Sequence, residues 1–420
     1  MTPKDRIKIT LSYKDPDKLP VDFGGMLATG IHVSTIYKLR QRLRLDTPGT
    51  PVKVVEPYQM LGEIADDLKE VLGVDTVSLL GSRNFFGFKN EGWKEWELDD
   101  GTPVLVPKLF NTVKNSDWSL YMYPQGDNSV PPAAKMPKNG FYFDLVIRQD
   151  PIDDASLNVE DNTEEFTLLS VTDLKDIKCR ADKLYSGTDY AIIASLVSSG
   201  FGDIALVPGP TLKHPKGIRD ISEWYISTVT RKDYIKDIFS KQLEIAIENF
   251  RRIYNSVGDK IDIVFISGTD FGTQSGPLIS LDLYKDLYKP YHLKVNNWIH
   301  ENTGWHTFMH SCGSIYKLIP EFIDAGFDIL NPVQISAEGM DLAKLKTEYG
   351  KYITFWGGGV DTQKTLPFGT PAQVKEETRR LIDIFSPGGG FVFSSVHNIQ
   401  PGVPVENIIA MIEVIKEYRK

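Results

Sequence analysis

The sequence has few cysteines and no long apolar run, and both shortages narrow the class of protein. Only two cysteines, Cys179 and Cys312, occur among 420 residues, too few for the disulfide framework of a small secreted scaffold. No apolar run reaches the roughly 18 residues that a membrane-spanning helix needs. The polar first residues, Met1-Thr-Pro-Lys, do not resemble a signal peptide. We therefore expect a cytoplasmic protein with no membrane segment.

The sequence also lacks an excess of basic residues. The 47 Lys and Arg residues are outnumbered by 56 Asp and Glu residues, which gives a net charge of −9 and a pI near 5.4. A protein that neutralises phosphates needs the opposite balance, so we expect no nucleic-acid partner. Apolar residues, in contrast, make up 41% of the chain, with 21 Phe and 18 Tyr. That is ample material for a large buried core, and among large α/β proteins enzymes predominate.

The second half of the chain alternates short apolar runs with longer segments of helical period. The runs predict buried strands, because parallel strands covered on both faces are apolar throughout. They are residues 204–208, 261–267, 305–310, 327–330, 352–356 and 391–394. The predicted helices are residues 230–256, 281–301, 314–325, 339–349, 371–385 and 404–419. This alternation predicts an α/β fold with a parallel sheet.

Segments upstream extend this alternation, and two further units would make eight. A helix near 59–72 precedes a strand at 76–80, and a helix near 188–199 precedes the run at 204–208. Eight units predict a (β/α)8 TIM-type barrel, and no glycine-rich dinucleotide fingerprint favours an open sheet instead. Residues 81–165 do not follow this alternation of strands and helices. Within them, the alternation of side-chain types at 141–147 suggests short antiparallel strands. We expect a single barrel domain over residues 1–420 with an inserted irregular or antiparallel segment at about 81–165.

Polar side chains gather where the predicted strands end, which is the end of a barrel that carries active sites. They lie in five successive loops and include Asp270, His310, Cys312, Asn331, Gln334, Asp361 and His397. We expect Asp270 to act in catalysis. We expect Asn331, Gln334 and Asp361 to contact substrate.

His310 and Cys312 are the most specific pair among them. Residues i and i+2 of an extended strand end face the same side, so the imidazole and the thiolate can reach one ion. Zinc binds both donors, and a catalytic zinc usually has three protein ligands and one open position. His397, Asp270 and Glu338 are candidates for the third ligand. The pair is also compatible with a packed thiol beside a hydrogen-bonding imidazole, and we expect Cys179, in a charged stretch, simply to pack.

Several segments around these residues resemble the uroporphyrinogen decarboxylase superfamily. The run that begins His310-Ser-Cys-Gly and extends to Pro332 is similar, as are Gly358-Gly-Val-Asp361 and the run from His397 to Asn407. Residues 270–280 also look like this superfamily. The resemblance covers roughly residues 200–420 and, more loosely, residues 21–31. It implies a (β/α)8 barrel and one of two chemistries.

The two chemistries differ in the residues they need. Decarboxylases of the superfamily hold substrate carboxylates with N-terminal arginines and use no metal; here Arg6 lies near the start, but Asp22-Phe-Gly-Gly-Met26 lacks the arginine-rich motif. Corrinoid-linked methyltransferases carry His-x-Cys and a later cysteine, all binding zinc. His310 and Cys312 match that branch, and His397 stands where the later cysteine would fall. The resemblance therefore implies a protein-bound zinc ion held by His310, Cys312 and His397.

We therefore expect a zinc-dependent methyltransferase that moves a methyl group between a small-molecule donor or acceptor and a corrinoid (cobalamin) carried by a partner protein. A His/Cys/His site is more electrophilic than a His/Cys/Cys site, which favours a methoxy or methylamine-type donor over a thiol acceptor. The alternative enzyme is a metal-free decarboxylase of the uroporphyrinogen decarboxylase type. A further alternative is a non-catalytic module that docks a corrinoid protein.

Overall fold

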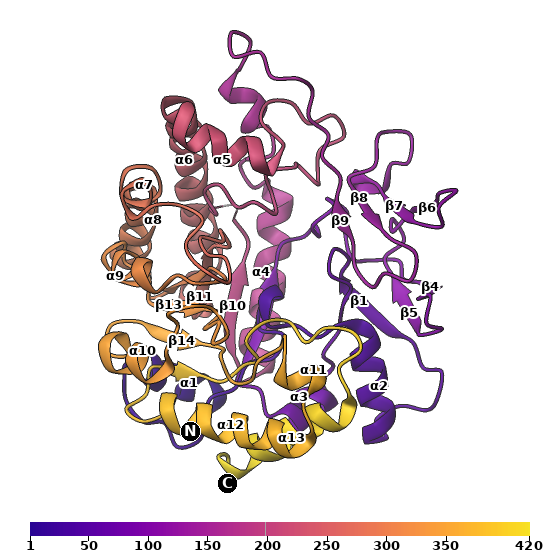
Figure 1. Ribbon diagram of the computed structural model, residues 1–420, viewed down its shortest axis with the longest axis vertical. Coiled ribbons are helices and arrows are strands. Elements are labelled where there is room, and N and C mark those ends of the chain that lie inside the picture. Colours follow the sequence, from indigo (N-terminus) through magenta and orange to yellow (C-terminus); the bar gives the residue numbers. More distant parts are fainter. Residues whose placement is uncertain (198) are drawn as a thin grey trace.

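The centre of the molecule is a curled parallel sheet of seven strands in a mixed α/β fold (Figure 1). The computed structural model describes residues 1–197 and 199–420. The strand order is β15-β14-β13-β12-β11-β10-β3, and every neighbouring pair is parallel. The bounds are β3 Thr76–Leu80, β10 Ala191–Ser195, β11 Ile263–Ser267, β12 His306–His310, β13 Ile329–Asn331, β14 Thr354–Trp356 and β15 Phe391–Val392. This order is consistent with a TIM-type barrel.

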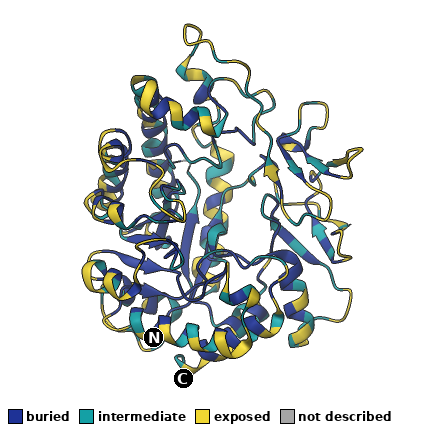
Figure 2. Cartoon of the chain, viewed as in Figure 1, coloured by how far each residue is buried: buried dark blue, intermediate teal, exposed yellow. Residues whose placement is uncertain are grey.

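Helices lie between successive strands and turn their exposed faces outward, while the strands are buried (Figure 2). The helices before β11 are α3 (Asp66–Leu72), α4 (Val171–Gly187), α5 (Ile221–Thr230) and α6 (Lys232–Val257). The later ones are α7 (Leu281–Leu283), the π-helical turn η5 (Tyr284–Tyr288), α8 (Lys289–Asn302), α9 (Ile319–Asp324), α10 (Leu342–Tyr349), α11 (Thr365–Phe368), α12 (Pro371–Phe385) and α13 (Val405–Glu417). Among the residues described, no helix combines the length and the apolar character needed to span a bilayer.

The first helix, α1 (Pro3–Leu11), covers the end of the sheet where the strands begin. Its backbone bonds to the residues before β10 and β15, through Lys4 N–H to the Asp189 carbonyl and Gly390 N–H to the Thr10 carbonyl. Ile7 and Leu11 pack into the interior cluster that also contains Ile263, Phe308, Trp356 and other inward-facing strand residues. This end of the sheet is therefore filled with apolar side chains, and polar chemistry is left to the opposite end.

The two edge strands, β3 and β15, are both bonded to the segment at residues 20–22. Phe393 N–H donates to the Pro20 carbonyl at 2.9 Å, and Asp22 N–H donates to the Phe393 carbonyl at 2.8 Å. On the other side, Asp75 N–H donates to the Val21 carbonyl at 2.7 Å. Residues 20–22 thus lie between the two edges of the curled sheet.

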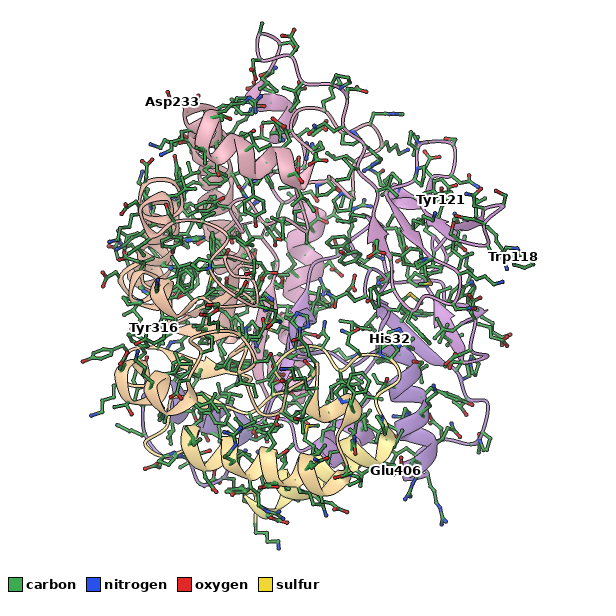
Figure 3. All side chains as sticks on the ribbon, viewed as in Figure 1. His32, Trp118, Tyr121, Asp233, Tyr316 and Glu406 are labelled. Carbon is green, nitrogen blue, oxygen red and sulfur yellow. The ribbon has the colours of Figure 1, made fainter. Side chains whose placement is uncertain are left out.

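The chain between β3 and β10 forms part of a side lobe, which we define as strands β1, β2 and β4–β9. These strands build two four-stranded sheets, β2-β1-β5-β4 and β6-β7-β8-β9, and the second is antiparallel throughout. The short antiparallel strands expected at 81–165 are therefore present. Figure 3 shows Trp118 and Tyr121 at the outer edge of the lobe. The bounds are β1 Val52–Glu56, β2 Leu61–Gly62, β4 Lys94–Glu97, β5 Pro103–Val106, β6 Thr112–Lys114, β7 Leu120–Met122, β8 Ala134–Met136 and β9 Asp144–Leu145, with α2 (Val33–Leu43) before them.

The structure corrects the sequence-based prediction at three places. The predicted helix at 188–199 contains strand β10 instead, because a five-residue run that is apolar on both sides has no period to tell a strand from a helix. The predicted strand at 204–208 is a turn, which Asp203 initiates by accepting hydrogen bonds from the Ala205, Leu206 and Val207 N–H groups. Cys179 does not pack in a core; it is exposed on α4.

His292 on α8 gives the fold a testable dependence on pH. The ring is fully buried, Tyr284 bonds its Nδ1 at 3.1 Å, and burial lowers its pKa to about 3. An unfolded histidine titrates near 6.5, so between these values the unfolded state binds more protons and stability falls as the pH falls. Relative to a His292→Leu variant, the wild type should lose roughly 1.4 kcal/mol of unfolding free energy per pH unit below 6.5. Urea denaturation of both proteins at pH 7.5, 6.0 and 5.0 measures this, and a constant difference would contradict the assignment.

Candidate metal centre

Three side chains from two loops meet at the end of the sheet where the strands finish. His310 ends β12, Cys312 follows two residues later, and His397 lies in the loop after β15. One ligand atom from each lies within 4.8 Å of the other two, and this trio is the group of possible metal ligands found in the described part of the chain. Glu338 and Asp270, the other candidates for a third ligand, are not in it.

The spacing of the trio fits a single tetrahedral ion. Cys312 Sγ lies 3.4 Å from His310 Nε2, and the two imidazole rings meet edge to face with centroids 5.4 Å apart. Ligands on one tetrahedral zinc ion, at about 2.3 Å for sulfur and 2.0–2.1 Å for nitrogen, lie about 3.5 Å from each other. The residues present therefore suit zinc in donor type and number, and Cys312 and His310 also in separation, with a fourth position left for a substrate or water.

Asn331 fixes which nitrogen of His310 faces the trio. The Asn331 amide donates from Nδ2 to the Trp356 carbonyl at 2.9 Å, which turns its Oδ1 toward His310 Nδ1 at 2.6 Å. Since a carbonyl oxygen only accepts, Nδ1 must carry the proton in this contact. In the neutral ring Nε2 then presents a lone pair toward Cys312. This is the arrangement by which a hydrogen bond to the outer nitrogen orients a metal-binding histidine.

His397 is held neutral by its surroundings. Burial lowers the pKa of His397 to about 3, and the neighbouring His310 lowers it further in the same direction. Among the described residues its ring has no hydrogen-bond partner, so both ring nitrogens remain free of protein contacts. A neutral imidazole is the form that binds a metal.

Cys312 is a protonated thiol in the metal-free protein. Burial raises the pKa of Cys312 well above its usual value, and the nearby Asp270 carboxylate raises it further. Metal coordination removes the proton of a thiol ligand. Cys312 therefore has to release one proton for a metal ion to bind here.

Asp270 lies beside the trio, in the loop after β11, and this loop is hydrogen-bonded to the loop that carries Cys312. Its Oδ1 accepts the Cys312 N–H at 2.7 Å and lies 3.9 Å from His310 Nε2. The Asp270 side chain is 31% exposed, so its second oxygen can meet a bound molecule. Two further residues contact or sense Asp270. The Tyr225 hydroxyl on α5 donates to the Asp270 backbone carbonyl at 3.4 Å. Burial raises the pKa of Asp203 to about 7, and the charge of Asp270 contributes to this rise. Neither Tyr225 nor Asp203 stands in a motif that the sequence made recognisable.

A cavity of about 270 Å³ opens on Cys312 and His397. Gln334 lines it; its Oε1 accepts the Gly313 N–H at 2.6 Å, which leaves its NH₂ group free for a substrate. Asn331 and Asp361, the other predicted substrate contacts, do not line the cavity. Asn331 lies behind His310, and Asp361 uses its Oδ1 to accept the N–H groups of Gln363 and Lys364. Substrate binding by any of these residues stays a prediction.

Two glutamines that the sequence analysis did not single out bridge the cavity. Gln274, after Asp270, donates from Nε2 to Gln363 Oε1 at 2.9 Å, and both residues are exposed and line the cavity. A larger cavity, of about 710 Å³, lies between β3, α3 and α4 and contains none of the predicted site residues. We place the chemistry at the smaller cavity because Cys312 and His397 line it.

Comparison with known proteins gives a family match over the part of the chain that contains the trio. Residues 215–418 match the uroporphyrinogen decarboxylase (URO-D) family. Over these residues the chain is similar to that family. Its matched region contains β11 to β15 and all three residues of the trio. The URO-D relationship therefore covers the strands and loops that build the site, while residues 1–214 lie outside it.

Individual relatives are distant. Uroporphyrinogen decarboxylase of Actinobacillus succinogenes is 28% identical over 158 residues, covering 36% of this chain and 41% of that protein. The enzyme of Mannheimia succiniciproducens is 27% identical over 145 residues, covering 33% of this chain and 37% of that protein. The chain thus matches about two fifths of the length of these relatives. Among solved structures, a methyltransferase from Methanosarcina mazei is similar over 100% of this chain and 99% of its own, with a TM-score of 0.54 and 16% identity, which shows a shared fold.

The contact between Asn331 and His310 yields a prediction about metal affinity. Asn331→Ala removes the acceptor that keeps the proton on Nδ1, so either ring nitrogen of His310 can then be protonated. Loss of such an outer hydrogen bond typically weakens metal affinity about 10–100-fold. Asn331→Asp keeps an acceptor at Nδ1 and should lose less. Competition of each variant with a chromophoric zinc chelator measures the affinity, and an alanine variant with wild-type affinity would show that Asn331 has no such role.

Proposed function

We propose that this protein is a zinc-dependent methyltransferase that moves a methyl group between a small molecule and a corrinoid carried by a partner protein. The convergence of His310, Cys312 and His397 on one point, with His310 Nε2 facing the other two, carries the proposal. A zinc ion at this point would supply a Lewis acid that activates the heteroatom carrying or receiving the methyl group.

The chain's own residues would bind and orient the small molecule. The free NH₂ group of Gln334 can donate to it, and the second oxygen of Asp270 can accept a hydrogen bond or a proton from it. The Gln274–Gln363 bridge lies across the cavity and would help to exclude water while the molecule is bound. Together these groups give a polar substrate a defined orientation beside the trio.

The cavity itself favours methyl transfer over decarboxylation of a tetrapyrrole. At about 270 Å³ it is smaller than the roughly 300–1,000 Å³ of sites for drug-sized ligands. None of the described residues that line it is an arginine or a lysine. Arg6, the arginine near the start of the chain, is committed at the opposite end of the sheet, where it pairs with Asp17 at 2.8 Å and with Asp75. A metal-free decarboxylase remains the alternative that the metal analysis below tests.

In this proposal the whole chain is one barrel domain. Residues 20–22 act as its eighth strand, in line with their hydrogen bonds to both sheet edges. The segment at about 81–165 is then an insertion whose strands, with β1 and β2, form the side lobe. The insertion is thereby available for recognition of the partner or of the small molecule.

Substitution of His397 tests the metal centre. Protein prepared without chelators should contain one zinc ion per chain. His397→Ala leaves two protein ligands, which are too few for tight binding, and zinc should be lost or greatly weakened. His397→Cys restores a three-ligand set and should keep the metal. Elemental analysis of the purified variants measures the content.

His306→Gln is the matched control, because His306 lies on the same strand as His310 but outside the trio. It should retain wild-type zinc. Full zinc occupancy in His397→Ala would exclude His397 as a ligand. Conversion of methylcobalamin to cob(I)alamin, or the reverse, with small methyl acceptors or donors then tests the reaction. Activity that survives chelation and releases carbon dioxide from a carboxylated substrate would favour the decarboxylase.

A further inference from the structure

The loop that carries His397 is held by a part of the chain far away in sequence. His32 N–H donates to the Ile399 carbonyl at 2.9 Å, and Ile399 N–H donates to the Gly30 carbonyl at 3.0 Å. These two bonds make a parallel bridge between Ile31 and Ile399. Figure 3 places His32 at the start of α2, close to the side lobe. The N-terminal segment therefore lies directly against the loop that carries His397.

Asn398, the neighbour of His397, makes the side-chain part of this connection. Its Oδ1 accepts the Gly30 N–H at 2.6 Å, and its Nδ2 donates to Gln59 Oε1 at 2.8 Å. The side chain is completely buried. Because a backbone N–H only donates, the orientation of the amide is fixed.

The partners of Asn398 are themselves fixed. Gln59 N–H donates to Glu56 Oε2 at 2.7 Å, and Glu56 is a buried residue at the end of β1. Gly30 packs against Leu61, because a Cβ at residue 30 would lie 2.8 Å from Leu61 Cδ1. Both hydrogen bonds of Asn398 thus end on residues that are themselves bonded or packed within the N-terminal part of the fold.

The His397 ring, in contrast, makes no hydrogen bond of its own within the described residues. Its own carbonyl, on the C-terminal side of the ring, accepts the Ser395 hydroxyl at 2.7 Å. The direction in which the ring points is then set by the backbone on its two sides. On the C-terminal side, Ser395 holds the His397 carbonyl and Asn398 holds the next residue.

We propose that Asn398 is a positioning residue for the candidate metal centre: by bonding Gly30 and Gln59, it aims His397 at His310 and Cys312. This inference rests on the proposed function for the role of His397 as a ligand. It also means that residues 30 and 59, which lie outside the URO-D match at 215–418, complete the site. A chain truncated to the matched region would lack the third ligand's support.

Two variants and a matched control test the proposal on the full-length protein. Asn398→Ala removes both hydrogen bonds, and Gln59→Ala removes one of them without touching the loop. Thr35→Val is the control, because Thr35 Oγ1 bonds the Gln400 carbonyl at 3.0 Å in the same loop but does not support residue 398. Competition with a chromophoric chelator should show zinc affinity lowered about 10–100-fold by Asn398→Ala. Gln59→Ala should lower it less, and Thr35→Val should not change it.

A double-mutant cycle separates positioning from a general effect on folding. If Asn398 acts through His397, Asn398→Ala should cause no further loss of affinity once His397 has been replaced by alanine. An equal loss in both backgrounds, or unchanged affinity in the single variant, would overturn the proposal.

Hydrogen exchange of the metal-free protein makes the test independent of zinc. Asn398→Ala should speed exchange in a peptide that spans residues 396–400 at least tenfold, whereas peptides from β12 should exchange as in the wild type. If the wild type binds no zinc, the proposed function fails, yet faster exchange would still show that Asn398 holds the loop. Unchanged exchange at 396–400 would overturn the inference whatever the metal content.

Discussion

The hydrogen bond between Asn331 Oδ1 and His310 Nδ1 is the contact on which the candidate site depends. It joins the ends of neighbouring strands β12 and β13, and the Trp356 carbonyl at the end of β14 fixes the amide that makes it. Three adjacent strands therefore determine the orientation of one ring. With the ring in this orientation, His310 Nε2 faces the thiol of Cys312, two residues further along the chain. The pairing of the parallel strands therefore determines where the polar side chains at the strand ends lie relative to one another.

The third ligand depends on a different part of the fold. His397 comes from the loop after β15, at the edge of the sheet, where residues 20–22 connect β15 to β3. The N-terminal segment that bridges these edges continues to Gly30 and His32, which contact the loop directly. The same segment therefore joins the two sheet edges and supports His397. In this account, a site whose candidate ligands all lie within 215–418 also depends on the first 60 residues.

Much of the parallel sheet and its helices could be predicted from the sequence, and the failures have a common cause. Strands β11 to β15 were predicted because their apolar runs alternate with helices that have a clear amphipathic period, as in α12 and α13. The run at 191–195 is apolar on every side and was assigned to a helix, which displaced the strand to the turn at 204–208. Helix α4 gave no signal because only Ile177 and Ala181 are buried along it. Local patterns fail where burial is complete or nearly absent.

The ligand residues could likewise be predicted, but their support could not. His310 and Cys312 stand out by spacing, and the resemblance pointed to His397. Substrate binding by Asn331 stays a prediction, whereas its contact with His310 was not expected, because strand pairing places its amide against the ring. Asn398 and Gln59 are 339 residues apart in the chain, and nothing in either local sequence indicates that they meet.

The central claim is that His310, Cys312 and His397 bind one metal ion, and X-ray absorption at the zinc edge tests it most directly. The account predicts one sulfur at about 2.3 Å and two imidazole nitrogens at about 2.0–2.1 Å, with one further light atom in the fourth position. Replacement of Cys312 by serine should remove the sulfur shell. A spectrum of the wild-type protein with only oxygen and nitrogen neighbours, or with a single imidazole, would contradict the account.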